Sequence, residues 1–322
     1  MKVLLFENVN AAAVEKFKSA GFEVETLPTK LDPSELIKKI SDVEIFGHRS
    51  QTKLDAEILT AAKNLKASGV FGVGTNKIDL KTAAQIGVPV FNGANGSTRS
   101  VAELAVGFIF QLFRKVAEKN IGAHRGEWLK KVDGFELRNK IVGVVGFSNI
   151  GSQVGAICEA IGMRVVFSDP APVLPRGNCE KVSFEKLLEI SDVVSIHVPS
   201  LPSTKNLFDE KIISKMKTGA FLINTARGDV WDENAICENL KSGKLGGVAT
   251  DVFPAEPKNP TEKLNSKLCK FENAILTPHI GGSTREAQKN MGAEVAEKVV
   301  NFFETKNARA AINFHNLQNL RI

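Results

Sequence analysis

The chain of 322 residues is long enough for two ordinary domains, and its 43% hydrophobic and 24% charged residues are typical of a globular protein and exclude disorder. The net charge of +6 comes from lysines and arginines interleaved with glutamate and without a long basic run, so no nucleic acid is expected as a partner. No apolar run approaches the roughly 18 residues of a membrane span, which argues against a membrane protein. The four scattered cysteines lack a CxxC pair, which argues against a metal site and a disulfide framework and favours a cytoplasmic location.

Residues 1 to about 95 are predicted to form repeated strand–helix units. The expected strands, rich in apolar and β-branched residues, are residues 3–6, 22–27, 43–47, 65–73 and 89–91. The expected helices, which alternate with these strands, are residues 11–20, 34–40, 55–62 and 78–86. This alternation predicts a parallel sheet with helices on both faces.

A linker is predicted at residues 92–97, because NGANGS is rich in glycine and asparagine. Ser100 and Glu103 follow with the spacing of a capping box, so a helix is expected to begin there. Further strands and helices alternate beyond this point. Ser283 and Thr284 are expected to cap a long final helix.

A glycine-rich turn lies between a predicted strand and a predicted helix in the middle of the chain. The strand is residues 141–145, and Gly146, Ser148 and Gly151 occupy the three positions of the turn. A second strand ends at Asp169, 23 residues after Gly146. Strand, turn, helix, strand and acid form the order of a dinucleotide-binding βαβ unit. The alternative is a βαβ unit that packs and binds nothing.

Five polar side chains lie at or just after the carboxyl ends of predicted strands in the second half of the chain. They are Asp169, His197, Arg227, Asp251 and His279. In an open parallel sheet this edge is where ligands bind, so the pattern favours a binding site over chance turn chemistry.

Arg227, Glu256 and His279 have the chemistry that reversible hydride transfer between a nicotinamide and a 2-keto acid requires. A guanidinium can grip a carboxylate and polarise the adjacent carbonyl. A histidine can give or take a proton near neutral pH, and a carboxylate beside it favours its charged form. Taken singly, each has a structural alternative: a surface charge, a turn acid and a core histidine.

The chain closely resembles the D-isomer-specific 2-hydroxyacid dehydrogenases over nearly its whole length. The resembling stretches are RSQTKLD, GVGTNKIDL, NGSTRSVAELAVG, AHRGEW, IGMRVVFSD, SDVVSIHVPSLPSTKN, INTARGDV, ATDVFPAEP and TPHIGGSTREAQ. The resemblance implies an α/β fold of two doubly wound parallel-sheet domains. A Rossmann-type dinucleotide domain at residues 96–283 would be inserted in a flavodoxin-like substrate domain made of residues 1–95 and 284–322.

The resemblance also implies the site residues, with NAD as the cofactor and no metal. The catalytic set would be Arg227, Glu256 and His279, with Glu256 paired to His279. The implied cofactor contacts are Gly146, Ser148, Asn149, Ile150, Gly151, Asp169, His197, Pro199, Thr204, Thr225, Ala226, Arg227, Asp251, His279, Gly281 and Gly282. The implied substrate contacts are Arg49, Ser50, Val73, Gly74, Arg227 and His279. Asp169 favours NAD over NADP, because an acid repels a 2′-phosphate.

The members that the chain resembles most interconvert 3-phosphoglycerate and 3-phosphohydroxypyruvate in serine biosynthesis, so a phosphorylated 2-hydroxy or 2-keto acid is the expected substrate. Two alternatives stay open. One is an unphosphorylated 2-keto acid such as 2-oxoglutarate or hydroxypyruvate, and the other is a dinucleotide-binding sensor with weakened catalysis. A homodimer or homotetramer is implied, through the helix near Ser100 and the segment around Trp128.

The sequence departs from the family pattern in three places. Ser148 replaces the middle glycine of the turn, which is expected to weaken cofactor binding by about 1–2 kcal/mol. Gln51 replaces a second arginine that would face the substrate phosphate, a loss of about 1.5–3 kcal/mol that Lys53, Arg138 or Lys140 could offset. The chain ends at Ile322, so feedback by serine through an ACT-type regulatory domain is not expected.

Overall fold

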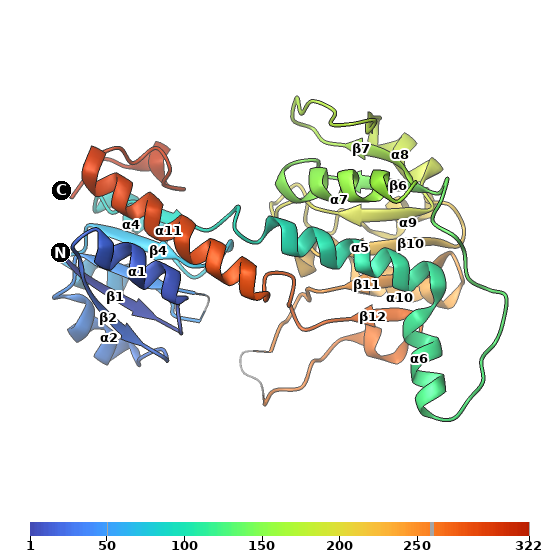
Figure 1. The fold of residues 1–322 in the computed structure, drawn as a ribbon, viewed down its shortest axis with the longest axis horizontal. Helices are drawn as coiled ribbons and strands as arrows, with labels where there is room; N and C mark the ends of the chain where they lie inside the picture. Colours follow the sequence, from blue (N-terminus) through green and yellow to red (C-terminus); the bar gives the residue numbers. More distant parts are fainter. Residues whose placement is uncertain (50, 258–260, 322) are drawn as a thin grey trace. The chain divides into compact units, whose positions relative to one another are not determined.

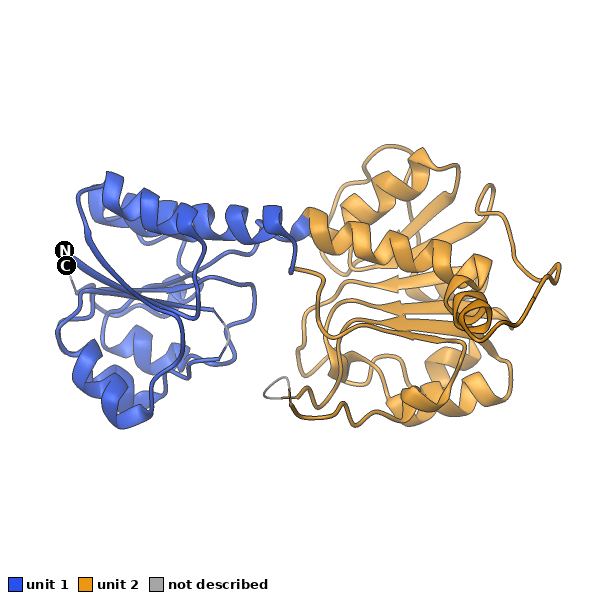
Figure 2. Ribbon diagram, turned by 60° about the horizontal axis from the view of Figure 1, so that its bottom comes forward, with its two compact units in different colours: residues 1–98, 283–322 blue, residues 99–282 orange. Residues whose placement is uncertain are grey.

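The computed structural model describes residues 1–49, 51–257 and 261–321. Its contacts divide the chain into two compact units, which are coloured separately in Figure 2. The first unit comprises Met1–Thr98 and Ser283–Ile322, and the second comprises Arg99–Gly282. The first unit therefore contains both termini, and the second lies within it in the sequence.

The first unit is a five-stranded parallel sheet with helices on both faces. Its strands, in the spatial order β2-β1-β3-β4-β5, are β1 (Lys2–Phe6), β2 (Glu23–Leu27), β3 (Ile45–His48), β4 (Ala67–Val70) and β5 (Val90–Asn92). Its helices are α1 (Ala11–Ser19), α2 (Pro33–Ile40), α3 (Ala56–Ala61), α4 (Leu80–Gln85) and α11 (Arg285–Thr305). This strand order is the flavodoxin-like one, in which ligands bind at the carboxyl ends of the strands.

Alternating side chains of β1 build two hydrophobic cores in the first unit. Val3 and Leu5 pack on one face, and Leu4 and Phe6 pack on the other. The first core is covered by α1 and α11, which lie side by side in Figure 1. The second core is covered by α2, α3 and α4. The long helix α11 thus returns from the end of the chain to close the first unit.

The second unit is a seven-stranded parallel sheet. Its strands, in the spatial order β12-β11-β10-β9-β6-β7-β8, are β6 (Ile141–Val145), β7 (Arg164–Ser168), β8 (Glu180–Lys181), β9 (Val193–Ile196), β10 (Ala220–Asn224), β11 (Leu245–Thr250) and β12 (Ala274–Leu276). Its helices are α5 (Thr98–Arg114), α6 (Val116–His124), α7 (Asn149–Ala160), α8 (Phe184–Ile190), α9 (Glu210–Ser214) and α10 (Glu233–Lys241). One core lies against α5 and α7 and the other against α8, α9 and α10, so helices again cover both faces, as Figure 2 shows.

The predicted fold class is confirmed in both units. The direction of the chain through the second sheet reverses between β6 and β9, which is the switch point of the Rossmann order. In both units the pairings are parallel throughout the described strands. All strand ends that carry candidate site residues in the second unit therefore lie at one edge of its sheet.

The predicted capping box is wrong. The helix α5 begins at Thr98, so Ser100 already lies within its first turn. The Ser100 hydroxyl donates instead to the carbonyl of Gly281 (2.6 Å), and Glu103 pairs with Nε of Arg99 (2.6 Å). A tertiary hydrogen bond thus uses the hydroxyl that the sequence pattern assigned to a local cap.

Candidate active site

The candidate site is the carboxyl edge of the seven-stranded sheet in the second unit. His279, Asp251, Arg227, His197 and Asp169 follow β12, β11, β10, β9 and β7 respectively, which is also their order along the sheet. Because the strands are parallel, five polar side chains separated in sequence are brought to one edge. The local geometry of each loop decides what that edge can bind.

Two glycines of the turn after β6 cannot carry a side chain. Gly146 has φ +88°, its N–H donates to the carbonyl of Ser168 (2.9 Å), and a Cβ there would lie 2.6 Å from the carbonyl oxygen of His197. A Cβ on Gly151 would lie 2.0 Å from the carbonyl oxygen of Gly146. The backbone therefore packs closely where a phosphate would meet the first turn of α7.

Ser148, at the middle position of the turn, is the N-cap residue of α7 and is exposed. Its φ of −87° is one that any L-residue adopts, so the backbone does not require glycine here. Its side chain makes no capping hydrogen bond. The effect of the serine is thus confined to the space that its hydroxymethyl group fills beside the helix N-terminus.

Asp169 joins the end of β7 to the glycine turn. Its Oδ2 accepts a hydrogen bond from the N–H of Phe147 (2.8 Å), and its Oδ1 accepts one from the N–H of Ala171 (2.9 Å). Each carboxylate oxygen can accept a further bond. The half-buried acid can therefore still accept from a ribose hydroxyl beside the turn.

Polar atoms without a protein partner lie buried along the same edge. They include Nδ1 of His197 and Oγ1 of Thr225. Nε2 of His197 lies 2.8 Å from Oγ of Ser195, and burial lowers the pKa of His197 to about 3, so its imidazole is neutral. Buried polar atoms are normally satisfied. These two fit a site that a polar ligand completes, and the edge as a whole suits a dinucleotide.

The loop after β10 holds Arg227. The buried amide of Asn224 braces this loop: its Nδ2 donates to the carbonyl of Arg227 (2.9 Å), and its Oδ1 accepts from the N–H of Ala226 (3.0 Å). The next residue, Gly228, touches the loop after β11, because a Cβ there would lie 2.0 Å from the carbonyl carbon of Phe253. This close approach brings the Arg227 loop against the loop that carries Glu256.

His279 and Glu256 form a hydrogen-bonded pair. Nδ1 of His279 lies 2.9 Å from Oε2 and 3.0 Å from Oε1 of the carboxylate. The hydrogen bond to Glu256 raises the pKa of His279, and its partial burial opposes this rise. Burial also raises the pKa of Glu256, but the hydrogen bond and charge of His279 outweigh it and hold that pKa below its ordinary value. The pair favours a protonated imidazole whose Nε2 faces away from the carboxylate.

Asp251 fixes the turn that presents His279. Its carboxylate, 2% exposed, accepts from the hydroxyl of Thr277 (2.5 Å) and from the N–H groups of Ile280 (2.8 Å) and Gly281 (2.7 Å). His279 itself has φ +54°, a left-handed conformation that is rare outside glycine and that surroundings must enforce. The sequence marked Asp251 only as a cofactor contact, and its bracing of the turn was not anticipated.

The remaining sequence-predicted residues are distributed over both units. The other candidate cofactor residues lie on the same edge loops: Asn149 and Ile150 open α7, Pro199 and Thr204 follow β9, Thr225 and Ala226 follow β10, and Gly281 and Gly282 follow β12. The hydroxyl of Thr204 donates to the carbonyl of Pro199 (2.6 Å). Arg49, Val73 and Gly74 follow β3 and β4 of the first unit. Ser50 lies outside the described residues.

Other chemistries have little support among the described residues. No group of three or more His, Cys, Asp or Glu side chains there could hold a metal ion. The described chain also contains no helix with the length and apolarity to cross a membrane. Burial raises the pKa of the Cys158 thiol to about 12 and also raises those of Cys179 and Cys237, so these thiols stay protonated. Arg227, Glu256 and His279 are the candidate reactive groups of this site.

Comparisons with known proteins point to one family. A family model described as "D-isomer specific 2-hydroxyacid dehydrogenase, NAD binding domain" matches residues 106–281. D-3-phosphoglycerate dehydrogenase from Escherichia coli (strain K12) is 46% identical over 317 residues, which cover 98% of this chain and 77% of the relative. The solved structure of D-2-hydroxyisocaproate dehydrogenase matches with a TM-score of 0.87 at 26% identity, covering 97% of this chain and 100% of that one. NAD-dependent formate dehydrogenase from Staphylococcus aureus, solved in complex with NAD, matches with a TM-score of 0.77 at 29% identity, covering 95% of this chain and 96% of that one.

Proposed function

Because the chain belongs to the D-isomer-specific 2-hydroxyacid dehydrogenase family, we propose that it interconverts 3-phosphoglycerate and 3-phosphohydroxypyruvate, a step of serine biosynthesis. The family that the sequence motifs indicated is confirmed, and the chain is an NAD-dependent 2-hydroxyacid dehydrogenase. The finer choice of substrate is supported by the relative from Escherichia coli, whose name specifies 3-phosphoglycerate. This proposal goes beyond the family in naming one substrate.

Three side chains carry the proposed chemistry. The guanidinium of Arg227 holds the substrate carboxylate and polarises the neighbouring carbonyl. His279 donates a proton from Nε2 to the carbonyl oxygen during reduction and takes it back during oxidation. Glu256 orients the imidazole through Nδ1 and favours its charged form. NAD, when bound, supplies or accepts the hydride at the substrate carbon.

The carboxyl edge of the second unit is the proposed cofactor site. The close-packed turn at Gly146 and Gly151 admits the pyrophosphate to the N-terminus of α7. Asp169 accepts from a ribose hydroxyl, which favours NAD over its 2′-phosphorylated form. Thr225 and His197 supply the buried polar atoms that lack a protein partner. We assign residues 96–283 to this cofactor domain.

The first unit is the proposed substrate domain, formed by residues 1–95 and 284–322. Arg49 and the backbone at Val73 and Gly74 follow neighbouring strands of its sheet, at the carboxyl edge where ligands of such sheets bind. Arg49 supplies a guanidinium suited to a phosphate or a carboxylate. Gln51 stands where a second cation would strengthen a phosphate site, which keeps an unphosphorylated 2-keto acid as the second candidate substrate.

A kinetic comparison of substrates tests the proposal. Oxidation of NADH would be followed with phosphohydroxypyruvate, hydroxypyruvate, glyoxylate and 2-oxoglutarate, and phosphohydroxypyruvate is expected to have the highest kcat/KM. A higher kcat/KM for hydroxypyruvate or 2-oxoglutarate would indicate that the substrate is an unphosphorylated acid. If NADH is not oxidised with any of the four acids, the proposed reaction is ruled out.

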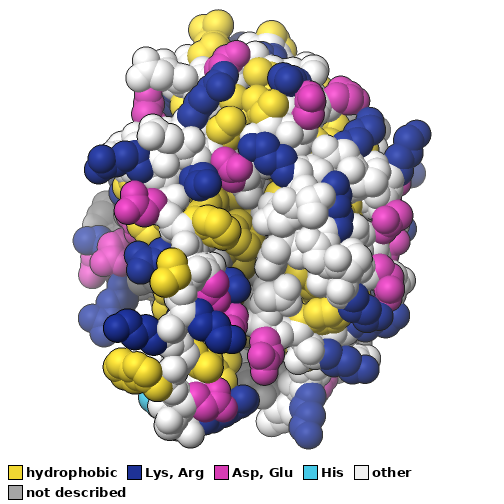
Figure 3. All heavy atoms as spheres, turned by 90° about the vertical axis from the view of Figure 1, so that its right-hand side faces the viewer, with side chains coloured by type: hydrophobic (Ala, Val, Ile, Leu, Met, Phe, Trp, Pro, Cys, Tyr) yellow, Lys and Arg dark blue, Asp and Glu magenta, His cyan; other side chains and the backbone are white. Residues whose placement is uncertain are grey.

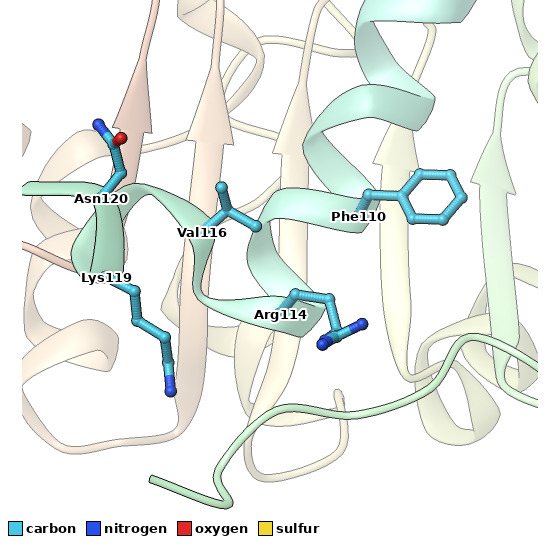
Figure 4. Close-up of a pocket in the computed structure, with 5 residues that line it drawn as sticks. All are labelled: Phe110, Arg114, Val116, Lys119 and Asn120. Atoms are coloured by element: carbon cyan, nitrogen blue, oxygen red, sulfur yellow. The ribbon is translucent and has the colours of Figure 1, made fainter. Parts of the chain in front are cut away.

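A homodimer or homotetramer is part of the proposal. Phe110 and Arg114 of α5 and Val116, Lys119 and Asn120 of α6 line a shallow groove on the second unit, shown in Figure 4. Trp128, on the segment after α6, is 88% exposed. The view in Figure 3 shows hydrophobic side chains exposed among lysines and arginines. Exposed apolar surface of this kind suits a second copy of the chain.

The cytoplasm is the proposed location. The four cysteines are free in the structure, and Cys158, Cys179 and Cys237 are buried. Free thiols without a disulfide partner suit a reducing compartment. Both candidate substrates are small organic acids, and neither requires another compartment.

A further inference from the structure

Glu7 lies beside the loop that carries the proposed substrate contact Arg49. It directly follows β1, and the β3 loop, by which we mean the described residues Arg49, Gln51 and Thr52, follows β3. These two strands are parallel neighbours in the sheet of the first unit. Both segments therefore leave the sheet at the same edge. Glu7 was not predicted as a site residue, although an acid just after a strand was the signal that marked Asp169 and Asp251.

The carboxylate of Glu7 accepts hydrogen bonds along the β3 loop. Its Oε2 accepts from the N–H groups of Arg49 (3.0 Å) and Gln51 (3.0 Å). Its Oε1 accepts from the N–H (2.5 Å) and the hydroxyl (2.6 Å) of Thr52. The residue is 6% exposed, so these bonds are shielded from water. A buried carboxylate thus accepts from three backbone N–H groups of the loop, as a bound anion would.

The backbone at Glu7 is held in a rare conformation to make these contacts. Glu7 has φ +67° and Asn8 has φ +52°, two successive left-handed residues that are not glycine. Such positions persist where the surrounding structure enforces them, and they often accompany function. In this conformation the Glu7 carboxylate accepts hydrogen bonds from the backbone of Arg49, Gln51 and Thr52.

Glu7 remains charged despite its burial. Burial raises its pKa, but the hydrogen bonds from Thr52 and Gln51 outweigh this and hold the pKa below the ordinary value. His48 is itself buried, which lowers its pKa to about 4 and leaves it neutral at pH 7. The loop is therefore organised around a carboxylate anion and not around a protonated acid.

The occupied N–H groups limit how the β3 loop can recognise a substrate. The amides of Arg49, Gln51 and Thr52 already donate to Glu7, so they do not form an anion-binding nest for a ligand. Among these three described residues, recognition falls to the side chains, of which Arg49 is half-buried and Gln51 is exposed. The precise backbone of the loop then decides where the Arg49 guanidinium lies.

We infer that Glu7 is a positioning residue for substrate recognition, which acts by fixing the β3 loop so that Arg49 meets the phosphate of the substrate. The inference rests on the proposed function, because it takes Arg49 as the phosphate contact. It separates two roles in the first unit: Arg49 touches the substrate, and Glu7 holds the loop without touching it. It also explains why a buried charge is kept at the end of β1.

Glu7→Gln tests the inference with little change of shape. The amide keeps one acceptor oxygen and places an NH2 group against N–H donors, so the loop loses part of its anchor. We expect KM for phosphohydroxypyruvate to rise about tenfold, the scale of losing one hydrogen bond to a charged group, with kcat changed less than about threefold. KM for hydroxypyruvate, which lacks the phosphate, and the NADH dissociation constant should stay near their wild-type values.

Glu44→Gln is the matched control. Glu44 precedes β3, at the opposite edge of the same sheet, where its carboxylate accepts from the N–H of Lys2 (3.1 Å) and pairs with Lys66 (2.9 Å). It should leave the selectivity between the two substrates unchanged. If Glu7→Gln instead lowers kcat/KM for both substrates equally, Glu7 is only structural and the inference is overturned.

Thr52 provides a second test in case Glu7→Gln does not fold. Thr52→Val removes the hydroxyl bond to Glu7 and keeps the shape, whereas Thr52→Ser keeps the hydroxyl. We expect Thr52→Val to raise KM for phosphohydroxypyruvate and Thr52→Ser to restore it. Equal behaviour of the two variants would overturn the inference.

Hydrogen exchange separates a failure of this inference from a failure of the proposed function. In the variant the amides of Arg49, Gln51 and Thr52 should exchange faster than in the wild type, whichever substrate the enzyme uses. Unchanged exchange would refute the anchoring role even in an active enzyme. If exchange is faster in the variant but the wild type does not reduce phosphohydroxypyruvate, Glu7 still anchors the loop. The substrate phosphate is then rejected as the group that Arg49 binds.

Discussion

At the scale of single residues, the proposed chemistry depends on the protonation of His279. Its raised pKa means that the imidazolium persists to higher pH than in a free histidine. Reduction of a 2-keto acid needs this protonated form, so its rate should fall as the pH rises through the pKa of His279. Oxidation needs the neutral form, so its rate should rise over the same interval. The rates of reduction and oxidation should thus depend on pH in opposite directions, and both dependences should reflect the titration of His279.

Glu256→Gln should move this pH dependence to lower pH. The hydrogen bond and the charge of Glu256 raise the pKa of His279, and the amide removes the charge and weakens the bond. The falling limb of kcat/KM for 2-keto acid reduction should therefore shift to lower pH, and kcat at neutral pH should drop. His315→Gln, at an exposed histidine of the first unit, is the control and should change neither. An unmoved limb in Glu256→Gln would show that another group titrates.

Ser148→Gly asks what the serine of the glycine turn does to cofactor affinity. The φ of −87° at Ser148 gives glycine no conformational advantage, so any change reports the hydroxymethyl group itself. If that group crowds the pyrophosphate by about 1–2 kcal/mol, the NADH dissociation constant should fall about 5- to 30-fold in the variant. Calorimetric titration with NADH measures it. An unchanged constant would show that the serine is harmless.

Single positions differ in how far the sequence could predict them. Five polar residues were predicted because each lies at or just after the carboxyl end of a predicted strand, and parallel strands place such positions at one edge: Asp169, His197, Arg227, Asp251 and His279. Their hydrogen bonds could not be found in this way. The bracing of residues 277–281 by Asp251 depends on which strands are neighbours and on a left-handed residue, and neither has a local sequence signal.

At the scale of elements, periodicity and caps predicted most strands and helices of the first unit. The errors lie where a tertiary contact competes with a local pattern. Ser100 and Glu103 have the spacing of a capping box, but Ser100 bonds to Gly281 and α5 begins at Thr98. The helices α9 and α10 were not anticipated, although Asp209 and Asp232 cap them through their side chains.

Gly228→Ala should uncouple the two loops that hold Arg227 and Glu256. The added Cβ would lie 2.0 Å from the carbonyl carbon of Phe253, and a backbone atom cannot yield as a flexible side chain can. We expect the free energy of unfolding to fall by about 1–3 kcal/mol. We expect kcat/KM to fall by a larger factor than this free energy corresponds to, because the loops that hold Arg227 and Glu256 must separate. Gly107→Ala in α5 is the control, since a Cβ there meets nothing within 4 Å. Denaturant unfolding and kinetics measure both effects, and wild-type kcat/KM in Gly228→Ala would contradict the coupling.

At the scale of the whole molecule, the sequence predicted two doubly wound parallel sheets, and both are found. Alternating strands and helices are enough to predict parallel sheets, because a crossover helix must cover a face. The strand orders came from family resemblance, since the pattern of one strand does not identify its neighbours. Substrate identity depends on single side chains such as Gln51, and the fold leaves it open.

The whole molecule is expected to be at least a dimer through the α5–α6 face of the second unit. Phe110 is 43% exposed, and a stable interface needs apolar anchors of this kind at its centre. Phe110→Asp would place a charge in the groove beside Val116 and should therefore yield monomers. Light scattering measures the mass, with Leu174→Asp as the control, because Leu174 is 80% exposed and does not line the groove. Loss of the dimer in Phe110→Asp alone would locate the interface at this face. A monomeric wild type would reject it.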